Sequence, residues 1–155
     1  MSSLCVRNSL KSARSVANNA IVDPEVAEVV SQADFKEACL DRPIGVCLIA
    51  FLDPQPEAES ERAASIEILK TLKLKAFENG QSFHFMWVDG IKQESLRRAF
   101  DISDQLPGAV LISPGKGRFR PFLGGFDEEG LASFLQETVS GKGRTFKNPA
   151  KFGIV

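Results

Sequence analysis

The chain has 155 residues, of which 43% are hydrophobic and 25% charged, and its formal net charge is −1. This length and balance are typical of one globular domain with a core large enough to fold without disulfides or metals. The near-neutral charge gives no electrostatic footprint for nucleic acid, and no stretch approaches the roughly 18 to 20 apolar residues of a membrane span. We therefore expect neither nucleic acid nor a membrane as a partner.

The first part of the chain differs in composition from the rest. Its first 22 residues include three basic residues, five serines and no acidic residue. They lack the apolar centre of a secretory signal. Two interpretations stay open: a linker from inside a longer protein, or an organellar transit peptide, which is also rich in Ser and Arg and poor in acids.

From residue 25 to residue 140, short apolar runs alternate with helical patterns. The continuously apolar run 46–52 suits a strand that is covered on both faces. Ser31 has the place of a helix N-cap, and Asp127 that of another. In chain order the expected elements are a strand at 26–30, a helix after Ser31, a strand at 46–52, a helix at 57–77, a strand at 82–88, a helix at 93–100, strands at 110–113 and 118–123, and a helix from 127 that ends at Gly141.

This order, β-α-β-α-β-α-β-β-α, predicts the fold class. Strands separated by helices require right-handed crossovers and a parallel part of a sheet, and the last two strands form an antiparallel hairpin. The prediction is a three-layer α/β/α domain with a central mixed sheet. We expect a flexible basic segment at 1–24, the domain at 25–140, and a loose basic tail at 141–155.

The predicted order resembles that of thioredoxin, and particular residues support the resemblance. Phe51 followed by Asp53 and Pro54 resembles the end of the strand that leads into the thioredoxin active site. Leu106–Pro107, directly before a strand, resembles the cis-proline loop of that family. Segment 124–127 resembles the start of its last helix. The resemblance covers roughly residues 25 to 140 and implies a thioredoxin fold.

Within that superfamily, the chain most resembles the last, non-catalytic domain of protein disulfide isomerases that have two catalytic domains followed by an inactive one. The segments that carry this resemblance are 47–50, 65–70, 85–87, 94–96, 123–126 and 141–145. The resemblance implies the endoplasmic reticulum lumen for the parent protein. This sequence has no secretory signal at its start and no retention signal at its end, so we expect a piece of a longer protein or a relative used elsewhere.

The thiol chemistry of catalytic thioredoxins is missing. Disulfide exchange needs a thiolate and a second thiol two residues away, and the chain has no C-x-x-C. By the resemblance, those two positions fall near Pro56 and Glu59, and the family's buried carboxylate falls near Ala50. We therefore hypothesise that this domain has no dithiol–disulfide activity.

The cysteines are Cys5, Cys39 and Cys47, which are too widely spaced for a zinc site. We expect no metal and no cofactor. Similar family members carry a cysteine pair in the region of Cys39 and Cys47, which implies a structural disulfide. The alternatives are two buried thiols that act as small hydrophobes, or a catalytic pair, which burial in a strand disfavours.

The resemblance also implies a place for substrate. In thioredoxins, the cis-proline loop and the active-site loop form a groove in which substrate backbone lies. Its apolar lining here would be Leu52, Pro54, Pro56, Leu106 and Pro107. The alternative is that these are ordinary turn and packing residues.

Three functions remain open. The first is a non-catalytic binding module that recognises unfolded or client polypeptides and spaces neighbouring catalytic thioredoxin domains. The second is an independent thiol–disulfide oxidoreductase that uses Cys39 and Cys47. The third is a stand-alone thioredoxin-like adaptor. The missing C-x-x-C favours the first over the second.

Overall fold

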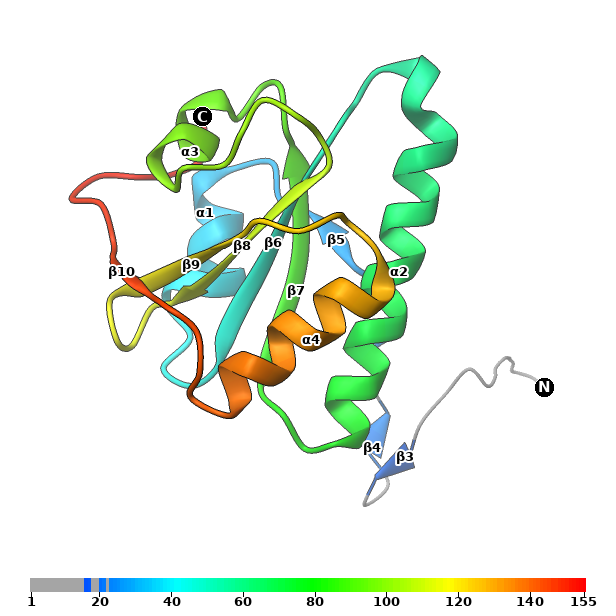
Figure 1. The fold of residues 1–155 in the computed structure, drawn as a ribbon, viewed down its shortest axis with the longest axis vertical. Helices are drawn as coiled ribbons and strands as arrows, with labels where there is room; N and C mark the ends of the chain where they lie inside the picture. Colours follow the sequence, from blue (N-terminus) through cyan, green and yellow to red (C-terminus); the bar gives the residue numbers. More distant parts are fainter. Residues whose placement is uncertain (1–15, 18–19, 22) are drawn as a thin grey trace.

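A mixed six-stranded sheet forms the middle layer of the computed structural model, which describes residues 16–17, 20–21 and 23–155 (Figure 1). In chain order the elements of this body are β5 (Ala27–Glu28), α1 (Gln32–Phe35), a π-helical turn (Lys36–Leu40), β6 (Val46–Leu52), a 3₁₀ turn (Pro56–Ala58), α2 (Glu59–Glu78), β7 (Phe83–Asp89), α3 (Glu94–Ala99), β8 (Gly108–Ser113), β9 (Arg118–Phe122), α4 (Glu128–Val139) and β10 (Phe146–Lys147).

The strands lie side by side in the order β10-β9-β8-β6-β7-β5. Strand β6 pairs in parallel with β7, which pairs in parallel with β5. On its other side β6 pairs antiparallel with β8, and β8 and β9 form the hairpin. The predicted fold class and element order are thus confirmed, with one further strand, β10, at the edge.

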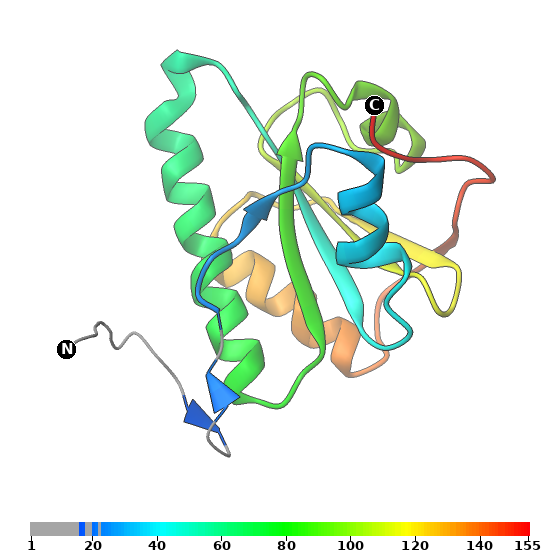
Figure 2. The same cartoon turned by 180° about the vertical axis from the view of Figure 1, so that it is seen from behind.

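Helices cover both faces of the sheet and complete the three layers. Helices α2 and α4 lie on one face (Figure 1), and α1 lies on the other, as the view from behind shows (Figure 2). The side chains of β6 alternate between the two cores. Cys47, Ile49 and Phe51 join the core that includes residues of α1 and α3. Leu48, Ala50 and Leu52 join the core beneath α2 and α4.

Two of the helices begin at the predicted caps. The backbone N–H of Asp34 donates to the Ser31 hydroxyl oxygen over 3.1 Å, and that of Gly130 donates to Asp127 Oδ1 over 2.6 Å. Each cap satisfies one N–H that has no partner inside the helix. The helix ends differ from the predicted ones by one or two residues, a normal spread for helix termini.

The predicted flexible segment 1–24 falls mainly outside the described residues. Its described part includes β3 (Val16–Ala17) and β4 (Ala20–Ile21), which pair antiparallel as a separate two-stranded sheet.

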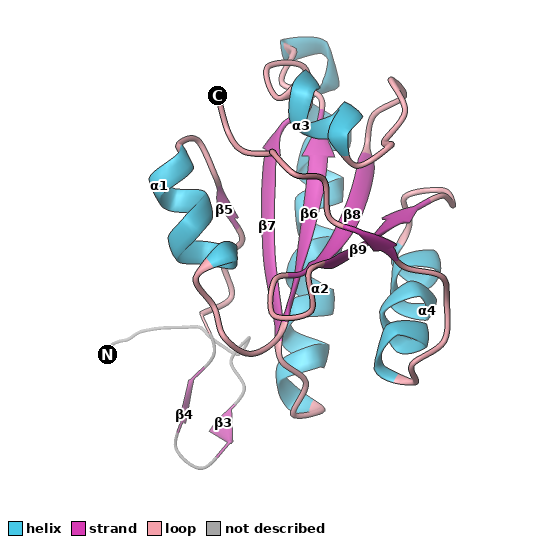
Figure 3. Ribbon diagram, turned by 90° about the vertical axis from the view of Figure 1, so that its left-hand side faces the viewer, coloured by secondary structure: helices cyan, strands magenta, loops and turns pink. Residues whose placement is uncertain are grey.

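The prediction of a loose tail at 141–155 is wrong. Strand β10 pairs antiparallel with β9 and extends the sheet by one strand. The chain then runs back along the α1 and α3 face, as Figure 3 shows. There the Phe152 ring packs edge-on against Phe35 and Phe100, with ring centroids 6.2 Å and 5.0 Å apart. The basic side chains of the segment stay exposed, as expected, while Phe152 and Ile154 pack into the core.

Two glutamine side chains hold the end of this segment. Gln93 is only 2% exposed, and its amide exchanges two hydrogen bonds with the backbone of Val155, of 2.9 Å and 3.1 Å. Gln32 Oε1 accepts a hydrogen bond of 2.7 Å from the N–H of Ile154. A buried amide needs such partners, because an unpaired polar group in a core is costly. The end of the segment is therefore part of the folded domain.

We predict that Phe152→Ala lowers the free energy of unfolding by about 2 kcal/mol, below the range for a fully buried Phe because this ring is only partly buried. Urea denaturation of the full chain measures the loss. The matched control is Lys151→Ala, an exposed neighbour whose removal should change stability by less than about 0.5 kcal/mol. Equal stability of the two variants would contradict the packing role of the segment.

Candidate functional site

A cavity of about 460 Å³ opens beside the cis peptide bond between Leu106 and Pro107. It lies between the loop 101–108, which leads into β8, and the segment 122–126, which joins β9 to α4. Its lining residues are Asp101, Ile102, Ser103, Gln105, Leu106, Pro107, Gly108, Phe122, Leu123, Gly124, Gly125 and Phe126. Leu123 is 86% exposed, the highest value among the large apolar residues of the described chain.

The first wall of the cavity is set by the end of α3. Asp101 adopts a left-handed conformation with φ of 60°, which Asp tolerates better than most residues. The N–H groups of Asp101 and Ile102 then donate to the carbonyls of Arg98 and Arg97, which ends the helix. The Ile102 side chain packs so closely to Gly108 that a Cβ at Gly108 would lie 2.8 Å from Ile102 Cγ2.

A buried arginine ties this wall to the sheet. Arg97 Nε donates to the carbonyl of Gly90 over 3.1 Å, and Arg97 Nη1 donates to Asp104 Oδ1 over 2.7 Å. Arg97 is 8% exposed in its side chain, so its charge requires these partners. The hydrogen bond from Arg97 and its positive charge lower the pKa of the Asp104 carboxyl.

The missing side chain of Gly90 leaves the space that the Leu106 side chain occupies. A Cβ at Gly90 would lie 2.7 Å from Leu106 Cδ1, so the Leu106 side chain fills the space that a larger residue would occupy. The N–H of Gly90 donates to the carbonyl of Leu52 over 2.8 Å, which fixes the end of β6 beside this contact. The loop of the cis bond is thus packed directly onto the ends of β6 and β7.

The structure brings together two of the five residues that the sequence proposes for a groove. Leu106 and Pro107 line the cavity, whereas Leu52, Pro54 and Pro56 are not among its lining residues. Leu52 is 1% exposed and belongs to the core beneath α2 and α4. Pro54 is half-buried, and Pro56 is exposed at the start of the 3₁₀ turn. The groove made from all five residues stays a prediction.

The loop 53–55, which by the resemblance lies at the position of the thioredoxin active site, is held by hydrogen bonds from an arginine. Arg62 Nη1 donates to the carbonyls of Asp53 and Gln55, over 2.7 Å and 3.1 Å. Pro56 and Glu59, in the predicted thiol positions, are exposed at the start of the 3₁₀ turn and of α2. Ala50, in the predicted carboxylate position, is fully buried in β6. The loop offers no thiol or buried acid for disulfide exchange.

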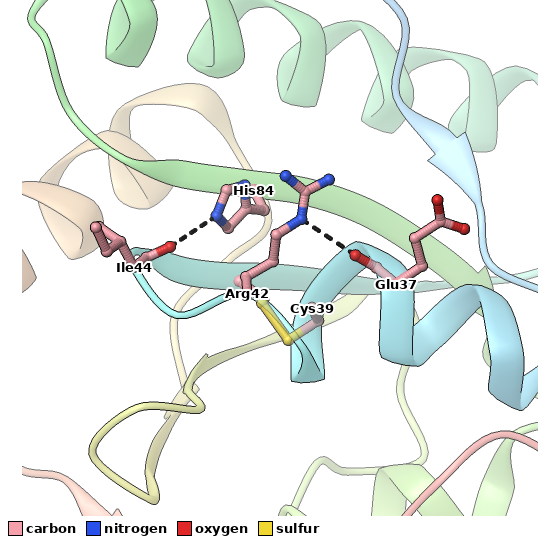
Figure 4. The surroundings of a disulfide bond; sticks show 6 residues. Glu37, Cys39, Arg42, Ile44 and His84 are labelled. Atoms are coloured by element: carbon pink, nitrogen blue, oxygen red, sulfur yellow. Dashed lines mark hydrogen bonds between the residues drawn. A yellow bond between two sulfur atoms is a disulfide. The ribbon is translucent and has the colours of Figure 1, made fainter.

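Cys39 and Cys47 are joined by a disulfide that ties the π-helical turn after α1 to β6 (Figure 4). Both residues are fully buried, so the bond is a part of the core. Two further contacts hold the segment between the two cysteines. Arg42 Nε donates a hydrogen bond to the carbonyl of Glu37, and His84 Nε2 lies 3.1 Å from the carbonyl oxygen of Ile44. His84, the one histidine of the sequence, thus has a structural contact beside the bond.

Within the described ranges, no three His, Cys, Asp or Glu side chains gather closely enough to hold a metal ion. None of the helices in these ranges has the length and apolar character for crossing a bilayer.

Sequence reasoning missed most of the cavity wall. Phe122, Leu123 and Phe126 are the apolar residues of its second side, and Ile102 contributes to its first. The signal for the second side was present, because segment 123–126 stands out in the resemblance to disulfide isomerases.

Comparison with known proteins places the chain in a family. Residues 15–143 match the model of the family described as "PDIA6-like, C-terminal thioredoxin-like domain". The chain is 29% identical to a protein disulfide-isomerase A6 homolog of Caenorhabditis elegans, over 79% of this chain and 27% of that protein. It is 27% identical to human protein disulfide-isomerase A6, over 79% of this chain and 27% of that protein. The chain thus spans less than a third of the length of these relatives.

Solved structures share the fold at low identity. The zinc-bound form of human ERp44 matches with a TM-score of 0.52 and 20% identity, over 73% of this chain and 30% of that one. A mutant thioredoxin from Halobacterium salinarum matches with a TM-score of 0.50 and 16% identity, over 76% of this chain and 93% of that one. At these identities the matches establish the thioredoxin fold and nothing finer.

We predict that Cys39→Ala/Cys47→Ala lowers the free energy of unfolding by about 2.5 kcal/mol, the chain-entropy value for opening a loop of this short length. Urea denaturation measures the loss. In an insulin reduction assay, the unmodified chain and the double variant should have the same background rate, because the sulfurs are buried. Cys5→Ala controls for the removal of a thiol elsewhere. Activity of the unmodified chain that disappears in the double variant would contradict a structural role for the bond.

We predict that the Asp104 carboxyl titrates below its ordinary value of 3.8, because Arg97 favours its charged form. A lowered folded-state pKa contributes stability above the unfolded-state pKa, and this contribution is lost as pH falls through the folded-state value. NMR titration of the carboxyl carbon measures the midpoint. Arg98→Gln is the control, because the charge of Arg98 lowers the pKa of Asp104 less than Arg97 does, and most of the pKa shift should remain in this variant. A titration midpoint of Asp104 at or above 3.8 in the unmodified chain would contradict the role of Arg97.

Proposed function

Because the chain belongs to the family of PDIA6-like C-terminal thioredoxin-like domains, we propose that it is the non-catalytic domain of a longer protein disulfide isomerase and that it binds unfolded client polypeptide. The observation that carries the binding role is the open cavity beside Leu106 and Pro107 with the exposed Leu123 at its edge.

The lining of the cavity offers apolar contacts for side chains and polar groups for the backbone of an extended ligand. Leu106, Leu123 and Phe126 give it apolar surface, and Asp101 is its only charged lining residue. Unfolded chains expose the apolar side chains that such a surface attracts, and burial of one leucine contributes about 1.5–3 kcal/mol. A binding role fits a surface of this kind better than catalysis, since the lining holds no thiol, histidine or basic residue.

A spacing role beside catalytic domains is the second part of the proposal. The matched relatives are named protein disulfide isomerases and are more than three times as long as the region matched. We infer that catalytic thioredoxin domains adjoin this domain in the parent protein, and that it supplies client binding next to their active sites. The alternative of an independent oxidoreductase has less support, because Cys39 and Cys47 are fully buried.

We also infer that the parent protein works in the endoplasmic reticulum lumen. A disulfide in the core is typical of chains that fold in an oxidising compartment, and the family resemblance points the same way.

We predict that Leu123→Asp weakens binding of a permanently unfolded, alkylated model protein by about tenfold or more, because the exposed apolar edge is lost and a charge is added. Fluorescence anisotropy with the labelled model protein measures the affinity. Ile44→Asp is the matched control, since Ile44 is also exposed (72%) but lies before β6, outside the cavity lining. Equal affinities of the two variants would count against the cavity as the binding site, and circular dichroism verifies that both are folded.

A further inference from the structure

A second cavity, of about 220 Å³, lies at the hairpin end of β9, away from the cis bond. Strands β8 and β9, the end of α4 and the loop that follows α4 form its walls. Four basic side chains line it: Lys116, Arg118, Arg120 and Lys142. Its other lining residues are Val46, Ser113, Leu111, Phe119, Thr138, Gly141, Gly143 and Thr145, so that the lining includes no acidic residue.

Strand geometry and a loop contact bring these charges together. Arg118 and Arg120 are two apart in β9, and alternate residues of a strand share one face of the sheet. Arg118 is fixed on the loop after α4, because its Nε donates to Thr145 Oγ1 over 3.1 Å and its Nη2 to the Thr145 carbonyl over 2.7 Å. Lys116 comes from the hairpin turn, and Lys142 from the other side of the cavity.

Arg120 forms the inner wall. Its guanidinium lies 4.5 Å from the ring centre of Phe134, and its Nη2 donates to Glu137 Oε1 over 2.5 Å. Its Nη1 is buried and has no acceptor in the described part of the chain. Gly143, with φ of 91°, lies against the guanidinium so closely that a Cβ there would overlap Arg120 Cζ.

The positive charge of the cavity is only partly balanced. Glu137 pairs with Arg120. Among the described residues, no carboxylate lies within 4.0 Å of the charged nitrogens of Lys116, Arg118 or Lys142. Three exposed cations therefore line one small cavity with no carboxylate partner in the part of the chain that the structure describes, and a cleft lined by charges of one sign raises the local concentration of counter-ions.

We propose that this cavity binds an anionic group, a carboxylate or a phosphate, carried on a small apolar body. Lysine ammonium and arginine guanidinium groups are the usual donors to both anions, and charge-assisted hydrogen bonds of this kind are among the strong ones in proteins. Val46, Leu111 and Phe119 give the apolar part of the lining. The volume is below the roughly 300 Å³ at which pockets for drug-sized ligands begin, so a single anionic group fits and a nucleotide does not.

The site differs from a phosphate-binding loop and from the client site. The segment 115–117 joins two strands and precedes no helix, so side-chain charges, and not a helix N-terminus, would hold the anion. The cationic cavity and the cavity beside Pro107 have no lining residue in common. The proposal is therefore independent of client binding and can be tested separately.

The test is an NMR titration of the full chain with two probes, inorganic phosphate and succinate, at low ionic strength. We expect at least one probe to cause saturable shifts of the backbone amides of Lys116, Arg118, Lys142, Gly143 and Thr145. The affinity should fall several-fold when sodium chloride is raised to 150 mM, because salt screens charges at this exposure. The probe that saturates identifies the anion as phosphate or carboxylate.

The variant Lys116→Gln/Lys142→Gln should weaken the probe at least tenfold. The matched control, Lys36→Gln/Lys92→Gln, removes the same charge from two exposed lysines outside the cavity lining and should leave the affinity within twofold. Amide spectra verify that both variants are folded. The proposal would be overturned if the amide chemical shifts changed linearly with the concentration of both probes, without saturation. It would also be overturned if the two double variants lost the same affinity for the probe.

Discussion

The burial of β6 on both faces is the constraint on which the rest of the structure depends. Every residue from Cys47 to Leu52 has an exposed fraction of 1% or less, so this strand must have helices above and below it. Strand β7 pairs with it in parallel, so the chain must cross over between the two strands, and α2 is that crossover. Strand β8 pairs with it antiparallel, so α3 joins β7 to β8 at one end of the sheet without a crossover. The disulfide attaches α1 to the same strand through Cys47. Removing this strand from the fold would leave neither core intact.

The cavity proposed to bind client and the cavity proposed to bind an anion lie at the two ends of the hairpin formed by β8 and β9. At one end the loop before β8 is held by a buried arginine and by a glycine that leaves room for Leu106. At the other end, the loop after α4 is held by Arg118 and lies against Arg120 at a second glycine. In both places a close backbone approach is combined with an arginine whose hydrogen bonds bridge separate segments. The sheet therefore presents two different surfaces, one that mixes apolar and polar groups and one that is cationic.

The sequence predicted the parts of this fold that repeat a pattern. The run 46–52 is apolar throughout because both of its faces are covered, and Ser31 and Asp127 are small polar residues placed where a helix needs an acceptor. Packing that depends on single residues was not predictable. Phe152 and Ile154 stand among glycine, proline and lysine with no periodicity, yet they pack on the α1 and α3 face. The client cavity joins segments that are some twenty residues apart, and its lining depends on side-chain exposure that local sequence does not encode.

The contribution of residues 152–155 to the core has a consequence for how this domain is made. Protein synthesis proceeds from the N-terminus, and domains generally fold as units once their residues are available. The rings of Phe35 and Phe100 are fully covered in the finished fold, and part of their cover is Phe152. While residues 152–155 are still inside the ribosome, that aromatic surface lacks the Phe152 ring. During its own synthesis the domain therefore passes through a stage in which it exposes apolar surface of the kind that promotes aggregation.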